Sequence, residues 1–274
     1  MTLSKRISTI LAKEIDPAFA ARAEFIFSHI EKTKPKKVLD VGSGRGFYLR
    51  SLAGYKFIDS LIGIETKDEY LSKANSYLKN RKAKLMKGDV YALPFKDNSF
   101  DCVILSEVLE HLGDEKKALK EINRVLKRHG SLLLTVPHHD FPWHWDPVNF
   151  FLMKVLNTHV RHDWWFIAGI WADHERLYTE KKLRKVIEKN RFEITNLKHT
   201  IFYSWPFTHL ILYGIGKNII EKIPGLSLNR FQTTKKSIAG NFLAFVMRLP
   251  NKIGQVINSK NKNGVGLVVL ARKK

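Results

Sequence analysis

A glycine-rich turn between an apolar run and a helical pattern constrains the fold more than any other feature of this chain. The apolar residues 38–41 lead directly into the sequence GSGRG at residues 42–46, and a helical pattern follows from Phe47 to about Leu52. Glycines at alternate positions allow backbone conformations that other residues avoid, and they let a ligand approach the main chain closely. A strand, a glycine turn and a helix in this order predict the ligand-binding edge of an open α/β sheet.

The same turn argues against a nicotinamide site. The dinucleotide fingerprint G-x-G-x-x-G needs glycine or alanine at position 47, where this chain has Phe47. The glycines alone are a weak signal. The identity of the ligand therefore depends on the residues that follow the neighbouring strands.

Apolar strand-like runs alternate with helical patterns along most of the chain, which is typical of a parallel sheet. A first helix is expected to begin at Asp16 and Pro17 and to end before Pro35. Further helices are predicted at residues 47–52, 68–80 and 114–128 and after a cap at Thr179. Strands are predicted at residues 38–41, 61–64, 84–87, 100–105, 131–136, 192–202 and 265–271. The expected fold is α/β, with seven mostly parallel strands in one sheet and helices on both faces.

Two stretches interrupt this alternation and are expected to be insertions. Residues 138–175 hold six of the 11 histidines and five of the six tryptophans. Residues 204–263 begin within the longest stretch without a charged side chain, residues 199–216, and continue as a basic, amphipathic region. We expect one domain over residues 1–274, with its core at 16–137, 174–203 and 264–274. The insertions are then 138–173, after the fifth strand, and 204–263, between the sixth and seventh.

Acidic side chains follow the second and third predicted strands. Glu65 ends the second strand, where a carboxylate can accept the hydroxyls of a ribose, and Asp89 follows the third. With these positions the chain resembles the class I S-adenosylmethionine-dependent methyltransferases, in particular the branch that methylates small molecules and lipids. The resemblance covers residues 18–137 well and 174–203 more loosely. It is carried by residues 38–46 (VLDVGSGRG), Glu65, 88–89 (GD), 93–95 (LPF), 99–101 (SFD) and 106–111 (SEVLEH).

The resemblance implies a Rossmann-like sheet and a set of contacts to S-adenosylmethionine. The expected methionine contacts are Asp40, Gly42, Ser43, Gly44 and Gly46, with Ser106 and Glu107 beside the same end of the cofactor. Glu65 is expected at the ribose hydroxyls, and Asp89 with Val90 at the adenine. Structural alternatives stay open: Asp40 can cap the turn, Glu65 and Asp89 can be solvated carboxylates, and Glu107 can be an acid collected at a helix start.

Methyl transfer from a sulfonium leaves most of the reactivity with the cofactor, so the protein mainly supplies orientation. A general base helps when the acceptor is a hydroxyl or an acidic carbon, and histidine suits that role near neutral pH. The candidates are His111, His138, His139 and His144. We favour His138 and His139 because they directly follow the fifth strand and Pro137.

A metal site is not expected. Histidines and aspartates cluster at residues 138–146, but the chain has neither an H-E-x-x-H motif nor a cysteine-containing ligand pattern. The aromatic side chains of the first insertion either line a pocket for a hydrophobic acceptor or pack as a lid on a core of their own.

The charge is unevenly distributed along the chain. Lys and Arg total 47 against 26 Asp and Glu, a net charge of +21, and residues 217–274 contribute +11 of it with 12 basic residues and one acidic. The content of 44% hydrophobic and 11% aromatic residues excludes a disordered basic tail. The single cysteine, Cys102, and the polar N-terminus favour a reducing, cytoplasmic setting.

The second insertion suggests a peripheral contact with an anionic membrane at the inner face. Apolar residues are expected to enter the interface and basic residues to meet head groups. A membrane span is not expected, because the 18 uncharged residues are near the lower limit for crossing a bilayer, are interrupted by polar residues and begin within a predicted strand. The apolar residues are Trp205, Phe207, Leu210, Ile211, Leu212 and Tyr213, with a second patch at Phe242, Leu243, Phe245 and Val246. The basic ones are Lys217, Lys222, Arg230, Lys235, Lys236, Arg248 and Lys252. A helical cap buried on the sheet is the alternative.

The leading hypothesis is a methyltransferase for a hydrophobic or lipid-like acceptor. One alternative is an RNA methyltransferase whose basic C-terminal region grips phosphates and whose aromatics stack bases. It is disfavoured because residues 106–109 read SEVL and not the Asn/Asp-Pro-Pro-aromatic motif of amino-directed nucleic-acid methyltransferases. A second alternative is a scaffold that binds the cofactor without catalysis. The sequence indicates neither the methylated atom nor the oligomeric state.

Overall fold

The computed structural model describes residues 4–12, 14–78, 82–164, 167–216, 238–257 and 263–274. The chain forms two compact units, which are described separately. The sheet unit consists of Phe25–Val136, Glu180–Lys198 and Val268–Lys274. The aromatic unit consists of Met1–Glu24, Pro137–Thr179 and His199–Leu267.

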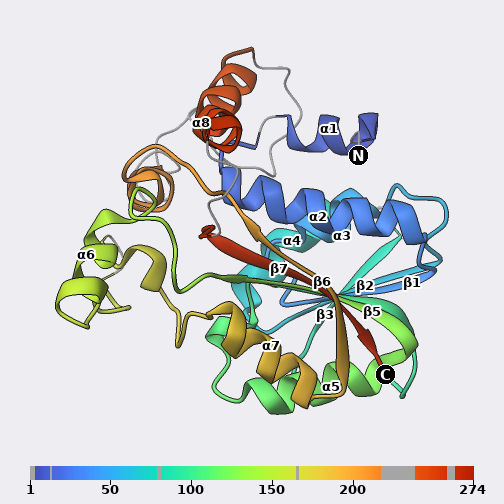
Figure 1. Ribbon diagram of the computed structural model, residues 1–274. Helices are drawn as coiled ribbons and strands as arrows, with labels where there is room; N and C mark the ends of the chain where they lie inside the picture. The colour runs from blue at the N-terminus through green and yellow to red at the C-terminus, as the bar shows by residue number, and fades with distance from the viewer. Residues whose placement is uncertain (1–3, 13, 79–81, 165–166, 217–237, 258–262) are drawn as a thin grey trace. The chain divides into compact units, whose positions relative to one another are not determined.

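Seven strands make one sheet in the order β3-β2-β1-β4-β5-β7-β6 (Figure 1). Neighbouring strands from β3 to β5 pair in parallel. β7 runs antiparallel to β6, because the Lys274 N–H donates to the Arg191 carbonyl at one end and the Val265 N–H to the Thr200 carbonyl at the other. The strands are β1 Lys37–Val41, β2 Ser60–Glu65, β3 Ala83–Lys87, β4 Phe100–Ser106, β5 Leu126–Pro137, β6 Phe192–Thr200 and β7 Gly266–Lys273.

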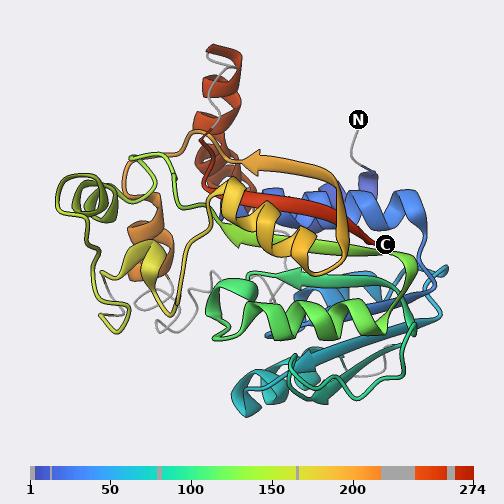
Figure 2. The same cartoon turned by 60° about the horizontal axis from the view of Figure 1, so that its bottom comes forward.

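Helices cover both faces of this sheet, as the sequence predicts. α5 (Glu115–Val125) and α7 (Glu180–Lys189) lie side by side on one face (Figures 1 and 2). On the other face, Phe27 of α2 (Pro17–Thr33) meets the rings of Phe47 and Tyr48 in α3 (Phe47–Leu52). α4 (Asp68–Leu78) packs beside the start of α3, where Ala74 lies close to Gly46. The α2 side chains at the spacing of one helix face, Ala23, Ile26, Phe27 and Ile30, are fully buried.

The predicted boundary between the fourth helix and the fifth strand is wrong. α5 ends at Val125, not near 128, and β5 begins at Leu126, not at Ser131. Leu126 is buried and pairs with Phe100, which favours the strand. The polar residues after it resemble a helix end because the strand is irregular there: His129 has φ +60° and the β4–β5 register shifts. β6 also ends at Thr200, two residues early, since Ile201 has φ +55°.

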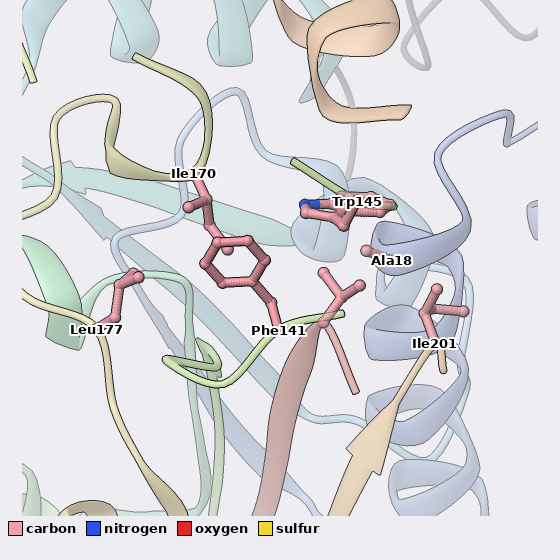
Figure 3. Close-up of a cluster of buried hydrophobic side chains, with 7 residues drawn as sticks. Ala18, Phe141, Trp145, Ile170, Leu177 and Ile201 are labelled. Atoms are coloured by element: carbon pink, nitrogen blue, oxygen red, sulfur yellow. The ribbon is translucent and has the colours of Figure 1, made fainter. Parts of the chain in front are cut away.

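The aromatic unit has a core of its own, which packs Phe141 and Trp145 against Ile170 and Leu177 (Figure 3). Residues from all three stretches of the unit contribute to this core, including Ala18, Ile201 and Val265. Its helices are α1 Lys5–Leu11, α6 Pro147–Val155, the 3-10 turn η2 Gly169–Trp171, the π-helix η3 Leu210–Gly216 and α8 Ile238–Ile257. None of the described helices is long and apolar enough to cross a membrane.

A buried polar hub fixes the first insertion within this unit. The Asp146 side chain accepts from the N–H of Asn149, its amide group and the Ile170 N–H. Asn149 in turn donates to the Ala168 carbonyl and accepts from the Val160 N–H. Gly169 passes so close that a Cβ there would lie 1.9 Å from Asp146 Oδ2. Phe141 and Trp145 are thus structural, while Trp143 and Trp164 are each 55% exposed.

Candidate cofactor-binding site

The glycine turn leaves the end of β1 in a conformation that only glycine adopts easily. Gly42, Gly44 and Gly46 have φ of +69°, +53° and +74°. The N–H groups of Gly42 and Ser43 donate to the Ile64 carbonyl in β2, which ties the turn to the neighbouring strand. A Cβ on Gly42 would lie 2.4 Å from Val108 Cγ2, whereas a Cβ on Gly44 would meet nothing within 4 Å. The backbone at Gly44 therefore borders open space that a ligand could occupy.

Asp40, the last but one residue of β1, is a buried carboxylic acid with spare hydrogen-bonding capacity. It is 2% exposed, and among the described residues its Oδ2 has no hydrogen-bond partner. The Oγ of Ser43 is also buried and has no hydrogen-bond partner among the described residues. Burial, and secondly the Glu65 carboxylate, raise the pKa of Asp40 well above its usual range. A cationic ligand would relieve both costs, because an opposite charge favours the ionised carboxylate.

Glu65 ends β2 and faces the same turn. Its Oε2 accepts from the Gly44 N–H at 2.8 Å, and its Oε1 accepts from the N–H groups of Thr66 and Lys67. It is 7% exposed. A carboxylate oxygen can accept two hydrogen bonds, so Oε2 can receive a ligand hydroxyl beside Gly44. The structure thus brings Asp40, Glu65 and the glycine turn together at the carboxyl ends of β1 and β2.

Asp89 and Val90 follow β3 at the same edge of the sheet. Asp89 is exposed, and its Oδ1 accepts from the Tyr91 N–H, so the carboxylate is held by its own turn. Val90 is 6% exposed. An exposed carboxylate next to a buried aliphatic side chain suits a planar ring with one polar edge.

Ser106 and Glu107 belong to a short hydrogen-bonded chain beyond β4. Ser106 Oγ lies 2.9 Å from the Thr135 hydroxyl and 3.3 Å from the Tyr48 hydroxyl, and the Thr135 hydroxyl donates to Glu107 Oε1. Glu107 has φ +55°, and its N–H donates to the Thr135 carbonyl. Thr135 and Tyr48 are not predicted as site residues, since a threonine in an apolar strand and a tyrosine in a helix carry no local signal in the sequence.

These features fit S-adenosylmethionine. The cofactor offers a sulfonium and an ammonium to a buried carboxylate, ribose hydroxyls to an acidic side chain, and a flat adenine to an apolar surface. The Asp40 Oδ2 without a partner among the described residues and the open space at Gly44 are the observations that fit a ligand of this kind best. All the residues predicted to contact the cofactor, from Asp40 to Glu107, belong to the sheet unit.

The predicted general bases lie in different surroundings. His138 is 3% exposed in the aromatic unit, and its Nδ1 bonds the Gly264 carbonyl. Burial, and secondly His199, lower the pKa of His138 to about 4, so it is neutral at physiological pH. His139 is half-exposed, with its Nδ1 3.0 Å from Asp140 Oδ1. His111 is exposed at the end of the 3-10 turn η1 (Leu109–His111) in the sheet unit.

His144 is the least suited of the four. Its Nδ1 accepts from the Ser204 N–H, and burial lowers its pKa.

Because a carbonyl can only accept, His138 must donate through Nδ1, which leaves Nε2 as its basic atom. In His139 the aspartate plays the orienting role, with Nε2 as the basic atom. Of these histidines, His139 combines exposure with a carboxylate partner.

The family comparison identifies the segment that carries this site. Residues 39–134 match the family described as a methyltransferase domain. Among curated proteins, the chain is 33% identical over 101 residues to the uncharacterised methyltransferase YcgJ of Bacillus subtilis, which spans 36% of this chain and 39% of that protein. It is 32% identical to demethylmenaquinone methyltransferase of Thermotoga maritima, over 38% of this chain and 45% of that protein.

A third relative is a sterol 24-C-methyltransferase of Aspergillus fumigatus, 37% identical over 40% of this chain and 30% of that protein. The matched segment thus spans less than half of the length of each of these curated relatives. The crystal structure of Bacillus subtilis YcgJ has the same fold, with a TM-score of 0.52 at 18% identity over 92% of this chain and 95% of that chain.

Proposed function

On the premise that residues 39–134 are a class I S-adenosylmethionine-dependent methyltransferase domain, we propose that this chain transfers a methyl group to a hydrophobic or lipid-like acceptor. The observation that supports the proposal best is the buried Asp40 at the glycine turn, with an oxygen that has no partner among the described residues. A buried carboxylate of raised pKa is costly unless it meets a cation, and the methionine end of the cofactor supplies one.

The residues that hold the cofactor are those of the sheet unit. Asp40 and the turn from Gly42 to Gly46 bind the methionine portion, and Glu65 binds the ribose hydroxyls. Asp89 and Val90 hold the adenine. Ser106 and Glu107, oriented by Thr135, line the methionine end. When bound, the cofactor supplies an electrophilic methyl group, and the protein's task is to orient it and keep water away.

The acceptor is proposed to be hydrophobic on two grounds. The aromatic unit keeps large apolar side chains exposed beside its own core, among them Trp143 and Trp164. Two of the relatives carry names that specify lipophilic acceptors, a demethylmenaquinone and a sterol. If the acceptor loses a proton, His139 takes it at Nε2 while Asp140 holds the other ring nitrogen.

Calorimetric titration with S-adenosylmethionine tests the cofactor assignment. We expect heat of binding with the natural chain and a loss of affinity of about 30-fold or more in Asp40→Asn, since a charged partner contributes about 2 kcal/mol or more. Asp97→Asn is the matched control: its carboxylate is 67% exposed and pairs with Arg124 in the same unit. Binding unchanged in Asp40→Asn would overturn the assignment.

The acceptor class requires a separate experiment. A host extract is incubated with methyl-labelled cofactor, and the label is partitioned between lipid, nucleic-acid and protein fractions. We expect it in the lipid fraction, with no incorporation by Asp40→Asn. Label in RNA would favour the alternative that the basic C-terminal region binds phosphates, and cofactor binding without labelling of any fraction would favour a scaffold.

A further inference from the structure

The aromatic unit exposes an unusual number of large apolar side chains, and its last helix, α8, carries the most exposed of them. Phe242 is 67% exposed, Phe245 51%, Ile253 49% and Val256 86%. Scattered single apolar residues on a surface are ordinary, whereas a continuous set on one helix face indicates an interaction site. The arrangement along the helix decides which case applies.

Most of the exposed apolar residues of α8 share one face, and Leu243, which is 41% exposed, lies off it. Phe242 is followed by apolar residues at intervals of 3, 4, 7, 11 and 14 positions, which is the repeat of one side of an α-helix. Leu249 and Val246 on this face are partly exposed. The face is defined by Phe242, Phe245, Val246, Leu249, Ile253 and Val256, and is called the outer face of α8 below.

The opposite face of α8 packs against the rest of the aromatic unit. Ala244 and Met247 are buried, and Asn251 Oδ1 accepts from the N–H groups of Phe202 and Tyr203. Gly254 packs on the Tyr203 ring, where a Cβ would lie 2.2 Å from a ring carbon. These contacts fix the rotation of the helix about its axis within the unit. The apolar residues of the outer face are therefore held away from the unit's interior.

Two neighbours extend the outer face. The indole of Trp205 donates to the Val246 carbonyl at 3.0 Å and is 43% exposed, so its ring lies beside α8. The Lys252 ammonium lies 5.7 Å from the centre of the Phe245 ring. A tryptophan and a lysine at the margin of an apolar face are typical of helices that lie in a membrane interface.

The charge of the segment identifies the partner. From Lys222 to Lys274 the sequence has 11 lysines and arginines and no acidic residue. A second copy of the chain would bring two such cationic segments together, which the repulsion between them opposes. An anionic lipid surface satisfies both the apolar face and the charge. Lys217, Lys222, Arg230, Lys235 and Lys236, predicted at head groups, lie outside the described residues.

Arg248 does not take the head-group role that the sequence suggests. Its guanidinium donates to the carbonyls of Leu11 and Glu14, which anchors α8 to the end of α1. Burial lowers its pKa despite nearby carboxylates. Among the described residues of α8, Lys252 is thus the basic residue free to meet lipid.

We propose that the outer face of α8, with Trp205 and Lys252 at its margin, docks this protein on an anionic membrane surface. The helix lies in the plane of the interface and inserts its phenylalanines among the acyl chains, while the basic residues meet the head groups. The proposal does not depend on methyl transfer, because docking needs neither cofactor nor acceptor.

Vesicle flotation of the purified full chain tests it at physiological salt. Vesicles of phosphatidylcholine with about one third phosphatidylserine, an anionic fraction that suffices for the surface attraction, are compared with phosphatidylcholine alone. We expect binding to the former that weakens with salt, and a loss of roughly 30-fold in Phe242→Ser/Phe245→Ser from the apolar area that no longer inserts. Lys252→Gln should lose roughly fivefold.

The matched control is Phe151→Ser/Val155→Ser on α6, whose side chains are 59% and 61% exposed. It removes similar apolar area from the same unit and should keep full binding. Equal losses in both double variants would overturn the proposal, as would binding that ignores the anionic lipid. So would α8-dependent self-association in sedimentation without vesicle binding, or α8-dependent retention of RNA in a gel shift. Circular dichroism and cofactor titration show that the variants are folded.

Discussion

Gly42→Ala should destabilise the sheet unit through a defined collision. The φ of +69° costs an alanine about 1–2 kcal/mol, because its Cβ approaches the carbonyl in the left-handed region. The same Cβ would lie 2.4 Å from Val108 Cγ2 and 3.3 Å from Cγ1, which adds about 1–3 kcal/mol of overpacking. The expected loss is about 2–5 kcal/mol, a large part of the ~5–15 kcal/mol that stabilises a typical protein.

Three further variants separate these contributions. Gly44→Ala has a comparable backbone cost, with φ +53°, but its Cβ meets nothing within 4 Å, so we expect a loss of only about 1–2 kcal/mol. Val108→Ala removes two half-buried methyl groups, at about 1 kcal/mol. The double variant Gly42→Ala/Val108→Ala should retain the backbone cost but lose the collision, and so be more stable than the sum of the singles by about 1–3 kcal/mol.

Urea denaturation without cofactor, followed by circular dichroism, measures all four free energies of unfolding. Strict additivity of the two single variants would refute the collision with Val108. Equal losses in Gly42→Ala and Gly44→Ala would show that the backbone angle alone determines the cost. Gly44→Ala should still weaken cofactor binding, because its methyl group occupies the open space at the turn.

Three further predictions concern titrating and polar groups. Burial raises the folded pKa of Asp40, so the free energy of unfolding of the natural, cofactor-free chain should fall as pH rises above the unfolded pKa of an aspartate. Asp40→Asn should not show this fall. Denaturation at pH 5 and 7.5 measures it, and an unaltered pH dependence in the variant would contradict the assignment. Burial lowers the pKa of His138 to about 4, so protonation favours unfolding and the free energy of unfolding should fall by about 2 kcal/mol between pH 7 and 5 through this group; His138→Asn should have a flatter profile in the same assay. Thr135→Val should lower cofactor affinity severalfold and cost about 1–2 kcal/mol, since it breaks the bonds to Ser106 and Glu107; the control Thr195→Val removes one exposed bond to the Leu270 carbonyl, and matching affinities in the two variants would exclude an orienting role for Thr135.

The sheet and its ligand-binding edge could be predicted from sequence because their signals are local. The turn at residues 42–46 follows its strand directly, and Glu65 and Asp89 each end an apolar run. The ends of neighbouring parallel strands meet at one edge, so these residues come together once the fold class is known. The order of the strands and the antiparallel β7 needed pairings between distant segments, which no local pattern carries.

The residues that support the site residues, and the packing of the first insertion, cannot be predicted from local sequence patterns. Thr135 is one polar residue in a buried strand, and only the register of β4 and β5 places it beside Ser106. The 138–175 stretch was open to two interpretations, a lid with its own core or a pocket lining. The structure assigns Phe141 and Trp145 to a core, because the hub of Asp146 and Asn149 draws the loop over them.

The position of β7 has a consequence for how the chain folds. This strand comes last in the sequence, yet it lies between β5 and β6, so the sheet keeps a gap until residues 266–273 arrive. While the ribosome synthesises the residues between β6 and β7, the chain would carry β5 and β6 with unsatisfied edges, and unpaired edges invite pairing with other chains. Closing the gap joins segments more than 60 residues apart, a loop-closure cost that slows folding. We therefore expect refolding to be slow and concentration-sensitive, and chaperones that shield strand edges to raise its yield.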